Sequence, residues 1–197
     1  PYFSQGQNYI IIEPTGFELT IRGAFPVWEY RAVSSTIRGI DLDLSLQLNE
    51  HIKFSNNSSW IEGYEKESKT PLINIPPFTT TNQIQFSLPN WKSFLMVLSS
   101  KSSLRQNQFP NHNFETSVVE NGVRMKKLVD ISTPPRGYHL LGMEFHWGPY
   151  PFFSDKISVS LIFDNMLNAS YRNYLNRLRF YADEMGRNMM LQIKIRH

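Results

Sequence analysis

The side chains that could perform chemistry are scattered along this chain of 197 residues. No two histidines have the i, i+4 spacing of a helical zinc site, and no Gly-x-Ser-x-Gly nucleophile motif is present. The chain contains no cysteine, which excludes a disulfide scaffold and a Cys-ligated metal site. We therefore predict no catalytic centre, no metal site and no cofactor, so that the protein is not an enzyme. A hydrolase that uses a serine and a histidine stays open.

Arginine and aromatic side chains gather in the stretch 166–187, and Arg105 precedes a second polar stretch at 107–113. A guanidinium presents several charged donors, so these side chains could engage an anionic chelate. The candidate ligand-binding residues are Arg105, Arg172, Arg177, Arg179, Tyr174 and Tyr181. The competing interpretation is that they bind lipopolysaccharide phosphates or one another.

The charge balance and the hydropathy restrict the class of protein. The formal net charge is +3, and the basic cluster Arg124–Lys127 is short, so a nucleic-acid partner is not expected. No apolar run approaches the ~20 residues that a transmembrane helix needs, which excludes a helical membrane protein. A membrane barrel remains possible, because alternation hides its apolar face from hydropathy averages.

The elements that must position these side chains are strands, because the dominant pattern has period two. In 40–48 every second residue is Ile or Leu, whereas Asp41, Asp43, Ser45 and Gln47 stand between them. Such a strand has one apolar face and one polar face, and its two aspartates line a wet lumen or are simply solvated. We expect about eight strands, and we interpret 171–185 as a loop. Their approximate positions are 9–13, 27–48, 52–64, 79–88, 92–106, 141–147, 157–164 and 189–196.

The connections between these strands alternate in length. Short connections are expected at 49–50, 89–91 and from 148, and long ones at 15–26, 66–78, 107–137 and 166–187. An up-and-down meander with all its long loops at one end produces this alternation. Outer-membrane barrels have it, with short periplasmic turns and long extracellular loops. The sequence thus predicts an all-β antiparallel meander that is part of a transmembrane barrel.

Several aromatic residues lie at or beside the expected short turns, namely Trp91, Trp147, Tyr150, Phe152 and Phe153. Aromatic side chains at that level are typical of the girdle that a barrel places at the membrane interface. The alternative is that they are core aromatics at the corner of a soluble sandwich.

The segment 157–197 resembles the end of TonB-dependent receptors. In that family a strand runs into an Asn-Leu-Phe-Asn-like turn, which reads Asn165-Met166-Leu167-Asn168 here, followed by Tyr171-Arg172, Tyr174-Leu175 and Gly186-Arg187-Asn188. Upstream, the proline-bounded stretch 71–77, Tyr30-Arg31 and the strand 38–42 are similar to the family. The amino-acid sequences of 128–131 and of the 171–188 loop look like those of receptors from Bacteroidetes-type bacteria.

The resemblance implies that 1–197 is the C-terminal segment of an outer-membrane barrel of about 22 strands, without the plug domain that occludes the pore. Such a receptor captures a scarce nutrient, for example a ferric siderophore, cobalamin or a glycan. The TonB–ExbB–ExbD complex energises uptake through the plug. His197 departs from the family, whose barrels commonly end on an aromatic residue.

The alternative is a non-transport module: a small autonomous outer-membrane barrel, or a soluble β binding protein with an adhesion or structural role. The exposure of the apolar strand faces discriminates between a membrane barrel and a soluble sandwich. In a membrane barrel these side chains face outward, whereas in a soluble sandwich they are buried. The side chains concerned are Leu42, Leu44, Leu46, Ile157, Val159, Leu161 and Ile193.

Overall fold

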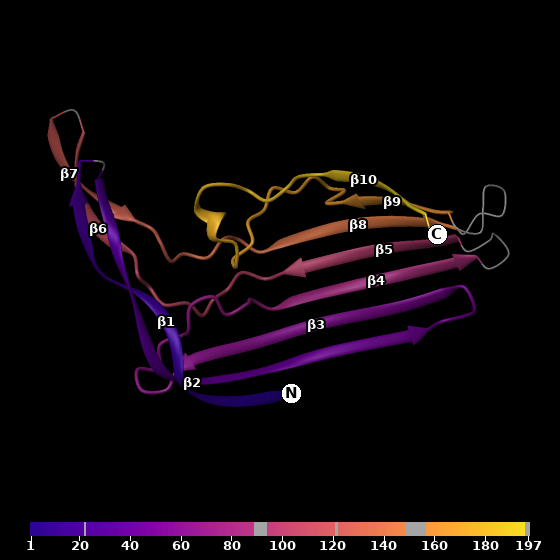
Figure 1. Ribbon diagram of the computed structural model, residues 1–197, viewed down its shortest axis with the longest axis horizontal. Coiled ribbons are helices and arrows are strands. Elements are labelled where there is room, and N and C mark those ends of the chain that lie inside the picture. Colours follow the sequence, from indigo (N-terminus) through magenta and orange to yellow (C-terminus); the bar gives the residue numbers. More distant parts are fainter. Residues whose placement is uncertain (22, 89–93, 121, 149–156, 196–197) are drawn as a thin grey trace.

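The chain forms one antiparallel sheet of eight strands with a separate two-stranded hairpin, in a computed structural model that describes residues 1–21, 23–88, 94–120, 122–148 and 157–195 (Figure 1). The sheet order is β1-β2-β3-β4-β5-β8-β9-β10. Its strands are β1 (Tyr2–Thr20), β2 (Gly23–Gln47), β3 (Ile52–Glu65), β4 (Thr79–Leu88), β5 (Phe94–Ser103), β8 (Tyr138–Trp147), β9 (Ile157–Asp164) and β10 (Asn188–Ile195). The hairpin consists of β6 (Phe114–Glu120) and β7 (Val123–Val129), and a 3-10 turn, η2, spans Arg177–Phe180.

The topology confirms the predicted all-β antiparallel meander. Each strand of the sheet pairs with its neighbour in sequence, except that β5 pairs with β8 because the β6–β7 hairpin intervenes. Among the described residues β1 pairs only with β2, and β10 only with β9, so these eight strands form an open sheet. No helix within the described ranges is long and apolar enough to cross a membrane.

The register gives the sheet two chemically different faces. Directly paired residues of an antiparallel ladder project to the same side. Ile40 pairs with Trp60 and Leu46 with Phe54 on what we name the apolar face. Asp41 pairs with Ser59, whose hydroxyl donates to the carboxylate at 2.6 Å, on what we name the polar face.

The apolar face is not a buried core. Leu42, Leu44, Leu46 and Ile193 are exposed. Ile157, Val159 and Leu161 are half-buried. A soluble sandwich built from these strands would bury all seven side chains, and none of them is buried in the sheet.

The turn between β2 and β3 and the ends of β4 and β8 lie at one end of the sheet, which we name the short-turn end (Figure 1). The β3–β4 and β9–β10 connections and the β6–β7 hairpin lie at the other end, the long-loop end. Near the short-turn end, Phe94, Phe145 and Trp147 pack together on the apolar face, with ring centroids 5.5 to 6.4 Å apart. Trp147 thus lies where an interfacial girdle was predicted. The other girdle candidates, Trp91, Tyr150, Phe152 and Phe153, lie outside the described residues, as do the turn at 89–91 and His197.

Two expected loops are strands instead. The stretch 15–26 continues β1 and β2 as a hairpin, with pairs from Tyr2↔Gly39 to Thr20↔Gly23 and irregularities at two points. Its glycines and Pro26 indicated a loop, but before Ser35 β2 pairs only with β1, and a two-stranded extension with free sides tolerates proline and bulges. The stretch 107–137 contains β6 and β7, which pair from Phe114↔Val129 to Glu120↔Val123. Phe17 stacks on Phe114 at 5.6 Å, so the two hairpins touch.

A small core lies on the polar face near the long-loop end. The connection between β3 and β4 folds back so that Leu72 and Ile75 bury against Val33 of β2. Gly63 makes this approach possible, because a Cβ there would lie 2.8 Å from Ile75 Cδ1 and 3.0 Å from Leu72 Cδ1. The loop therefore packs over the inside of the sheet rather than extending away from it.

Candidate ligand-binding cleft

The loop between β9 and β10 is fixed by two asparagines in left-handed backbone conformations. Asn165 has a φ of 48° and Asn168 a φ of 52°, which asparagine tolerates better than most residues. The Asn165 side chain accepts from Ala169 N at 2.8 Å and donates to Ala169 O at 2.9 Å. The Asn168 side chain accepts from Arg187 N at 2.9 Å. The Asn-Met-Leu-Asn turn therefore ties the start of this loop to its end.

Arg172 and Asp183 join the two arms of the same loop. Arg172 Nε lies 2.6 Å from Asp183 Oδ1, and Arg172 Nη1 donates to the Arg179 carbonyl at 2.9 Å. The Ser170 hydroxyl also donates to Asp183. The hydrogen bonds from Ser170 and from Arg172 hold the pKa of the Asp183 carboxyl below its usual value. The guanidinium of Arg172 thus has a fixed direction.

Arg179 is buried, which is unusual for an arginine. It donates to the Tyr174 carbonyl, and its guanidinium lies 4.5 Å from the Tyr174 ring centroid and 4.7 Å from that of Phe180. Burial lowers the pKa of Arg179 and raises that of Tyr174. Within the described residues, Arg179 Nε is a buried donor without an acceptor. Such a donor costs free energy until it is paired.

These side chains border a cleft of about 580 Å³ between the β9–β10 loop and the segment that enters β8. Its lining comprises Asp130, Thr133, Pro135, Arg136, Gly137, Ser170, Tyr171, Arg172, Arg179, Phe180 and Asp183. The lining thus contains three guanidiniums, two aromatic rings and two carboxylates. Asp183 is occupied by Arg172, and Asp130 accepts from the backbone of Ser132 and Thr133. The cleft therefore suits a ligand with negative charge and a flat or apolar part.

The predicted ligand-binding residues separate into three groups. Arg172 and Arg179 line the cleft, and Tyr174 supports Arg179 beneath it. Arg177 and Tyr181 are exposed but do not line the cleft. Arg105 borders a different depression, beside Trp60 and Glu62.

The cleft is also lined by Arg136, Tyr171 and Phe180, which are not among the six candidate residues named from the sequence. Tyr171 and Phe180 belong to the predicted loop, so their proximity to the arginines was a usable signal. Arg136 enters from the connection between β7 and β8, and no local pattern connects it to the β9–β10 loop.

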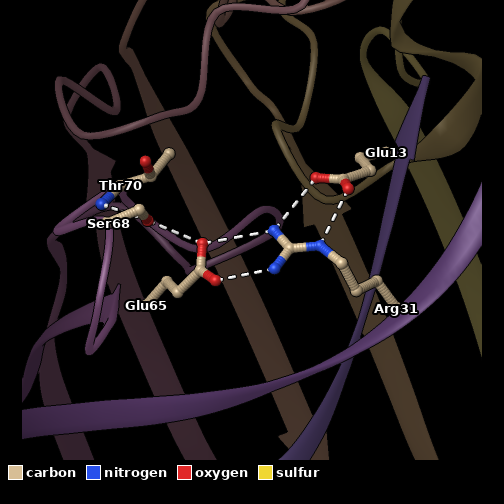
Figure 2. A network of polar contacts seen from close by, with 5 residues as sticks. All are labelled: Glu13, Arg31, Glu65, Ser68 and Thr70. Atoms are coloured by element: carbon tan, nitrogen blue, oxygen red, sulfur yellow. Dashed lines mark hydrogen bonds and ion pairs between the residues drawn. The ribbon is translucent and has the colours of Figure 1, made fainter. Parts of the chain in front are cut away.

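A second polar cluster fastens the β3–β4 connection (Figure 2). Figure 2 shows Arg31 between two carboxylates, with Nε 2.8 Å from Glu13 and Nη1 2.8 Å from Glu65. The Ser68 hydroxyl donates to Glu65 at 2.6 Å. Both carboxylates and the guanidinium are occupied here, so this cluster fixes the loop and is not a ready ligand site.

A serine, a histidine and a glutamate also meet on the polar face. His146 Nδ1 lies 2.8 Å from Ser160 Oγ, and His146 Nε2 lies 3.0 Å from Glu144 Oε2. His146 and Ser160 are direct cross-strand partners, and Glu144 is two residues from His146. The β-ladder places any such residues side by side. Their contact therefore does not by itself support the hydrolase that the sequence left open.

Comparison with known proteins gives structural matches only. No protein-family model and no curated protein matches the chain. The solved structure of the copper transporter OprC matches with a TM-score of 0.74 and 14% identity, covering 98% of this chain and 27% of that one. FpvA of P. aeruginosa, bound to heterologous pyoverdines, matches with a TM-score of 0.56 and 12% identity over 97% and 23%. The FpvAI–pyocin S2 complex gives 0.54 and 12% over 85% and 20%.

At these identities the likeness concerns the fold. The chain spans about a quarter of the length of the structures it matches. Its open eight-stranded sheet therefore corresponds to one arc of a larger barrel. OprC and FpvA are TonB-dependent receptors, the family that the sequence resembles, and the sheet has the fold of part of such a receptor barrel.

Proposed function

We propose that this chain is the C-terminal part of the barrel of a TonB-dependent outer-membrane receptor, from a Bacteroidetes-type bacterium, that actively imports a scarce nutrient such as a ferric siderophore. The observation that carries the proposal is the two-faced meander, exposed and apolar on one side and polar on the other, which aligns with OprC over 98% of its length. In a receptor barrel the apolar face contacts lipid, and the polar face lines the pore.

In this proposal the long-loop end is extracellular, and the cleft there captures the ligand. Arg172 and Arg179 are held by Asp183 and Tyr174, so their charges are oriented before binding. Arg136 is exposed at the cleft and has no ion pair within the described residues. A ligand carboxylate or catecholate would therefore meet Arg136 first, and the two fixed guanidiniums would then select its orientation.

Release into the periplasm belongs to parts of the receptor beyond this chain. The resemblance assigns it to the plug domain, which the TonB–ExbB–ExbD complex moves at the expense of proton-motive force. The outer-membrane lipid and lipopolysaccharide surround the apolar face. This chain contributes part of the wall and the four long-loop-end connections β1–β2, β3–β4, β5–β8 and β9–β10 that frame the pore.

The test is growth of a strain lacking the full-length gene on single scarce nutrients: ferric siderophores, cobalamin, copper and glycans. We expect loss of growth or uptake with one ligand class, and the same loss when TonB is deleted. Unchanged uptake of every ligand, or uptake that does not need TonB, would overturn the proposal.

The autonomous-barrel alternative has a separate test, which is expression of residues 1–197 alone. The sheet has two free edges, and unpaired backbone groups in lipid cost several kcal/mol each. We therefore expect the isolated chain to aggregate. A monodisperse, heat-modifiable barrel in detergent would instead support the small autonomous barrel.

A further inference from the structure

A second cavity lies on the sheet side of the cleft, against the polar face, and we name it the wall pocket. Its volume is about 330 Å³, at the lower end of what small-molecule sites offer, so it has room for part of a large ligand. Strand residues form its floor, and the β9–β10 loop covers it. The lining residues are Ser99, Lys101, Leu140, Leu141, Gly142, Asp164, Asn165, Tyr171, Met185, Gly186 and Asn188.

The β-ladder brings the floor residues together from four strands. Ser99 pairs with Gly142 across β5 and β8, and Asp164 pairs with Asn188 across β9 and β10. Lys101 is two residues beyond Ser99, so its side chain points to the same face of the sheet. A Cβ at Gly142 would lie 2.6 Å from Ser99 Oγ, within the floor of the pocket. The glycine therefore leaves space above the sheet at this point.

The wall pocket contains one positive and one negative side chain, and both are available to a ligand. Lys101 and Asp164 are exposed, and within the described residues they form no ion pair with each other or with another group. The cleft differs in this respect. There Asp183 is occupied by Arg172, and Asp130 accepts from backbone N–H groups. A ligand group that enters the wall pocket therefore meets an ammonium and a carboxylate that have no competing partner among these residues.

Tyr171 lines the cleft and the wall pocket alike. Its ring packs on that of Tyr138 with the centroids 4.5 Å apart, and its carbonyl accepts from Glu184 N at 2.9 Å. Burial, and then the negative charge of Glu184, raise the pKa of Tyr171, so its phenol keeps its proton at neutral pH and can donate. The two cavities therefore adjoin at one side chain with a fixed position.

The charges of the two cavities differ in the direction that transport needs. The cleft has three guanidiniums and two carboxylates in its lining, whereas the wall pocket has one ammonium and one carboxylate. Passage along a pore requires sites that bind well enough for entry and weakly enough for release. An acidic ligand group should therefore bind more strongly in the cleft than in the wall pocket, which lies against the proposed pore-lining face.

We propose that the wall pocket is a second binding subsite, which the ligand occupies on its way from the cleft to the pore. An acidic group of the ligand, a carboxylate or a catecholate, accepts from Lys101. A hydroxyl or amide N–H of the same ligand donates to Asp164, and Tyr171 is the side chain that the ligand passes between the two cavities. The inference rests on the proposed function, because it takes the long-loop end as the side of entry.

The test separates binding from transport in the full-length receptor, with two anionic iron chelates as probes, ferric enterobactin and ferric citrate. Binding is measured on cells that lack TonB, and the initial rate of uptake on cells that contain it. Lys101→Gln removes the ammonium group from the wall pocket. For an imported probe, we expect the maximal uptake rate to fall about tenfold, as for a lost charge-assisted hydrogen bond, while the dissociation constant changes by less than about twofold.

Lys53→Gln is the matched control, since Lys53 also lies on the polar face but near the short-turn end. It should leave the uptake rate unchanged. Lys101→Arg keeps a cation in the wall pocket and should restore most of the rate, which a purely structural role of the lysine would not require. An unchanged rate in Lys101→Gln, an equal loss in Lys53→Gln, or a parallel loss of binding overturns the proposal.

A second measurement locates the ligand while Lys101 is intact. Ser99→Cys and Asn57→Cys are made in a background in which any other cysteine is replaced. Both positions are on the polar face, but only Ser99 lines the wall pocket. During uptake, the imported probe should slow the reaction of Ser99→Cys with a water-soluble maleimide and leave that of Asn57→Cys unaffected. Equal reaction rates of Ser99→Cys with and without the probe contradict the proposal.

The proposed function fails in a different way. If the receptor imports neither probe nor any other ligand of the growth test, the assignment as a receptor is wrong, and the subsite is wrong with it. If it imports cobalamin, copper or a glycan but neither anionic chelate, only the subsite is wrong, because the wall pocket is assigned to an acidic ligand group. Import of a probe at the normal rate by Lys101→Gln likewise contradicts the subsite alone.

Discussion

Arg172 Nε lies 2.6 Å from Asp183 Oδ1, and this contact joins the two arms of the last long loop beside the cleft. The Ser170 hydroxyl donates to the same carboxylate. A guanidinium that borders a ligand cleft is thereby held in place before any ligand arrives. The contact makes the shape of the cleft depend on the ionisation of one exposed carboxyl group.

The first prediction concerns pH. Because Ser170 and Arg172 depress the pKa of Asp183, its ionised form stabilises the folded loop above the ordinary carboxyl pKa, about 3.9. This stabilisation is lost as the pH falls through the lowered folded-state pKa. We expect the amide protection of 170–184, corrected for intrinsic exchange, to be constant at mildly acidic and neutral pH and to fall only below that range. In Asp183→Asn the amide protection of 170–184 should already be reduced at pH 7, to the level that the unaltered protein reaches in acid. Undiminished protection in that variant would show that the Asp183 carboxylate does not hold the loop.

The second prediction concerns ligand affinity. Arg136→Ala removes an exposed guanidinium that borders the cleft, so binding of an anionic ligand should weaken about tenfold, as for a lost charge-assisted hydrogen bond. Arg177→Ala is the control, because Arg177 is exposed outside the cleft. Isothermal titration of the purified full-length receptor measures both. Equal affinities of the two variants would show that the cleft is not the binding site.

The third prediction tests the approach of the β3–β4 loop to the sheet. Gly63→Val places carbon atoms where Leu72 and Ile75 pack, and overpacking of this kind costs about 1–3 kcal/mol. We expect a lower midpoint of thermal unfolding and faster exchange in 71–77. Gly16→Val, where a Cβ meets nothing within 4 Å, is the control. The packing is wrong if both variants unfold at the same temperature.

The fourth prediction concerns the cluster of Figure 2. Arg31→Met removes the guanidinium between Glu13 and Glu65 and leaves two carboxylates facing one another. We expect the segment 66–70 to become more sensitive to limited proteolysis, while ligand binding in the distant cleft is retained. Arg31→Lys keeps the charge but can engage fewer acceptor oxygens, so it should give an intermediate result. Unaltered proteolysis in Arg31→Met would mean that the cluster does not hold the loop.

The strands were predictable because their two faces meet different surroundings. The alternation in 40–48 and 157–164 survives in the structure as one apolar and one polar face. The same rule did not identify the extended β1–β2 hairpin, since Pro14, Gly16 and Pro26 resemble turn signals. The hairpin accommodates them because its strands have no further partner before Ser35. A stronger signal was overlooked in Asn121-Gly122, a dipeptide typical of tight hairpin turns, which stands between β6 and β7.

The cleft was predictable only where one loop builds it. Arg172, Arg179 and Tyr174 lie within a few residues of one another, so a single polar segment brought them together. Arg136 reaches the cleft from another loop, and packing between loops leaves no period in the sequence. The Asn-Met-Leu-Asn motif was identified by resemblance. The structure adds its physical reason, which is two left-handed residues whose side chains close the loop.

The two free edges of the sheet have a consequence for folding. The outer backbone groups of β1 and β10 have no partner strand among the described residues. The eight-stranded sheet therefore ends in two unpaired edges. In lipid the unpaired backbone groups of either edge would cost free energy, so the sheet reaches its full stability only when both edges are paired. In the proposed receptor, the unit that folds is therefore larger than this chain. A mutation at either edge should lower the yield of the whole assembled barrel in an all-or-none manner rather than fray one strand.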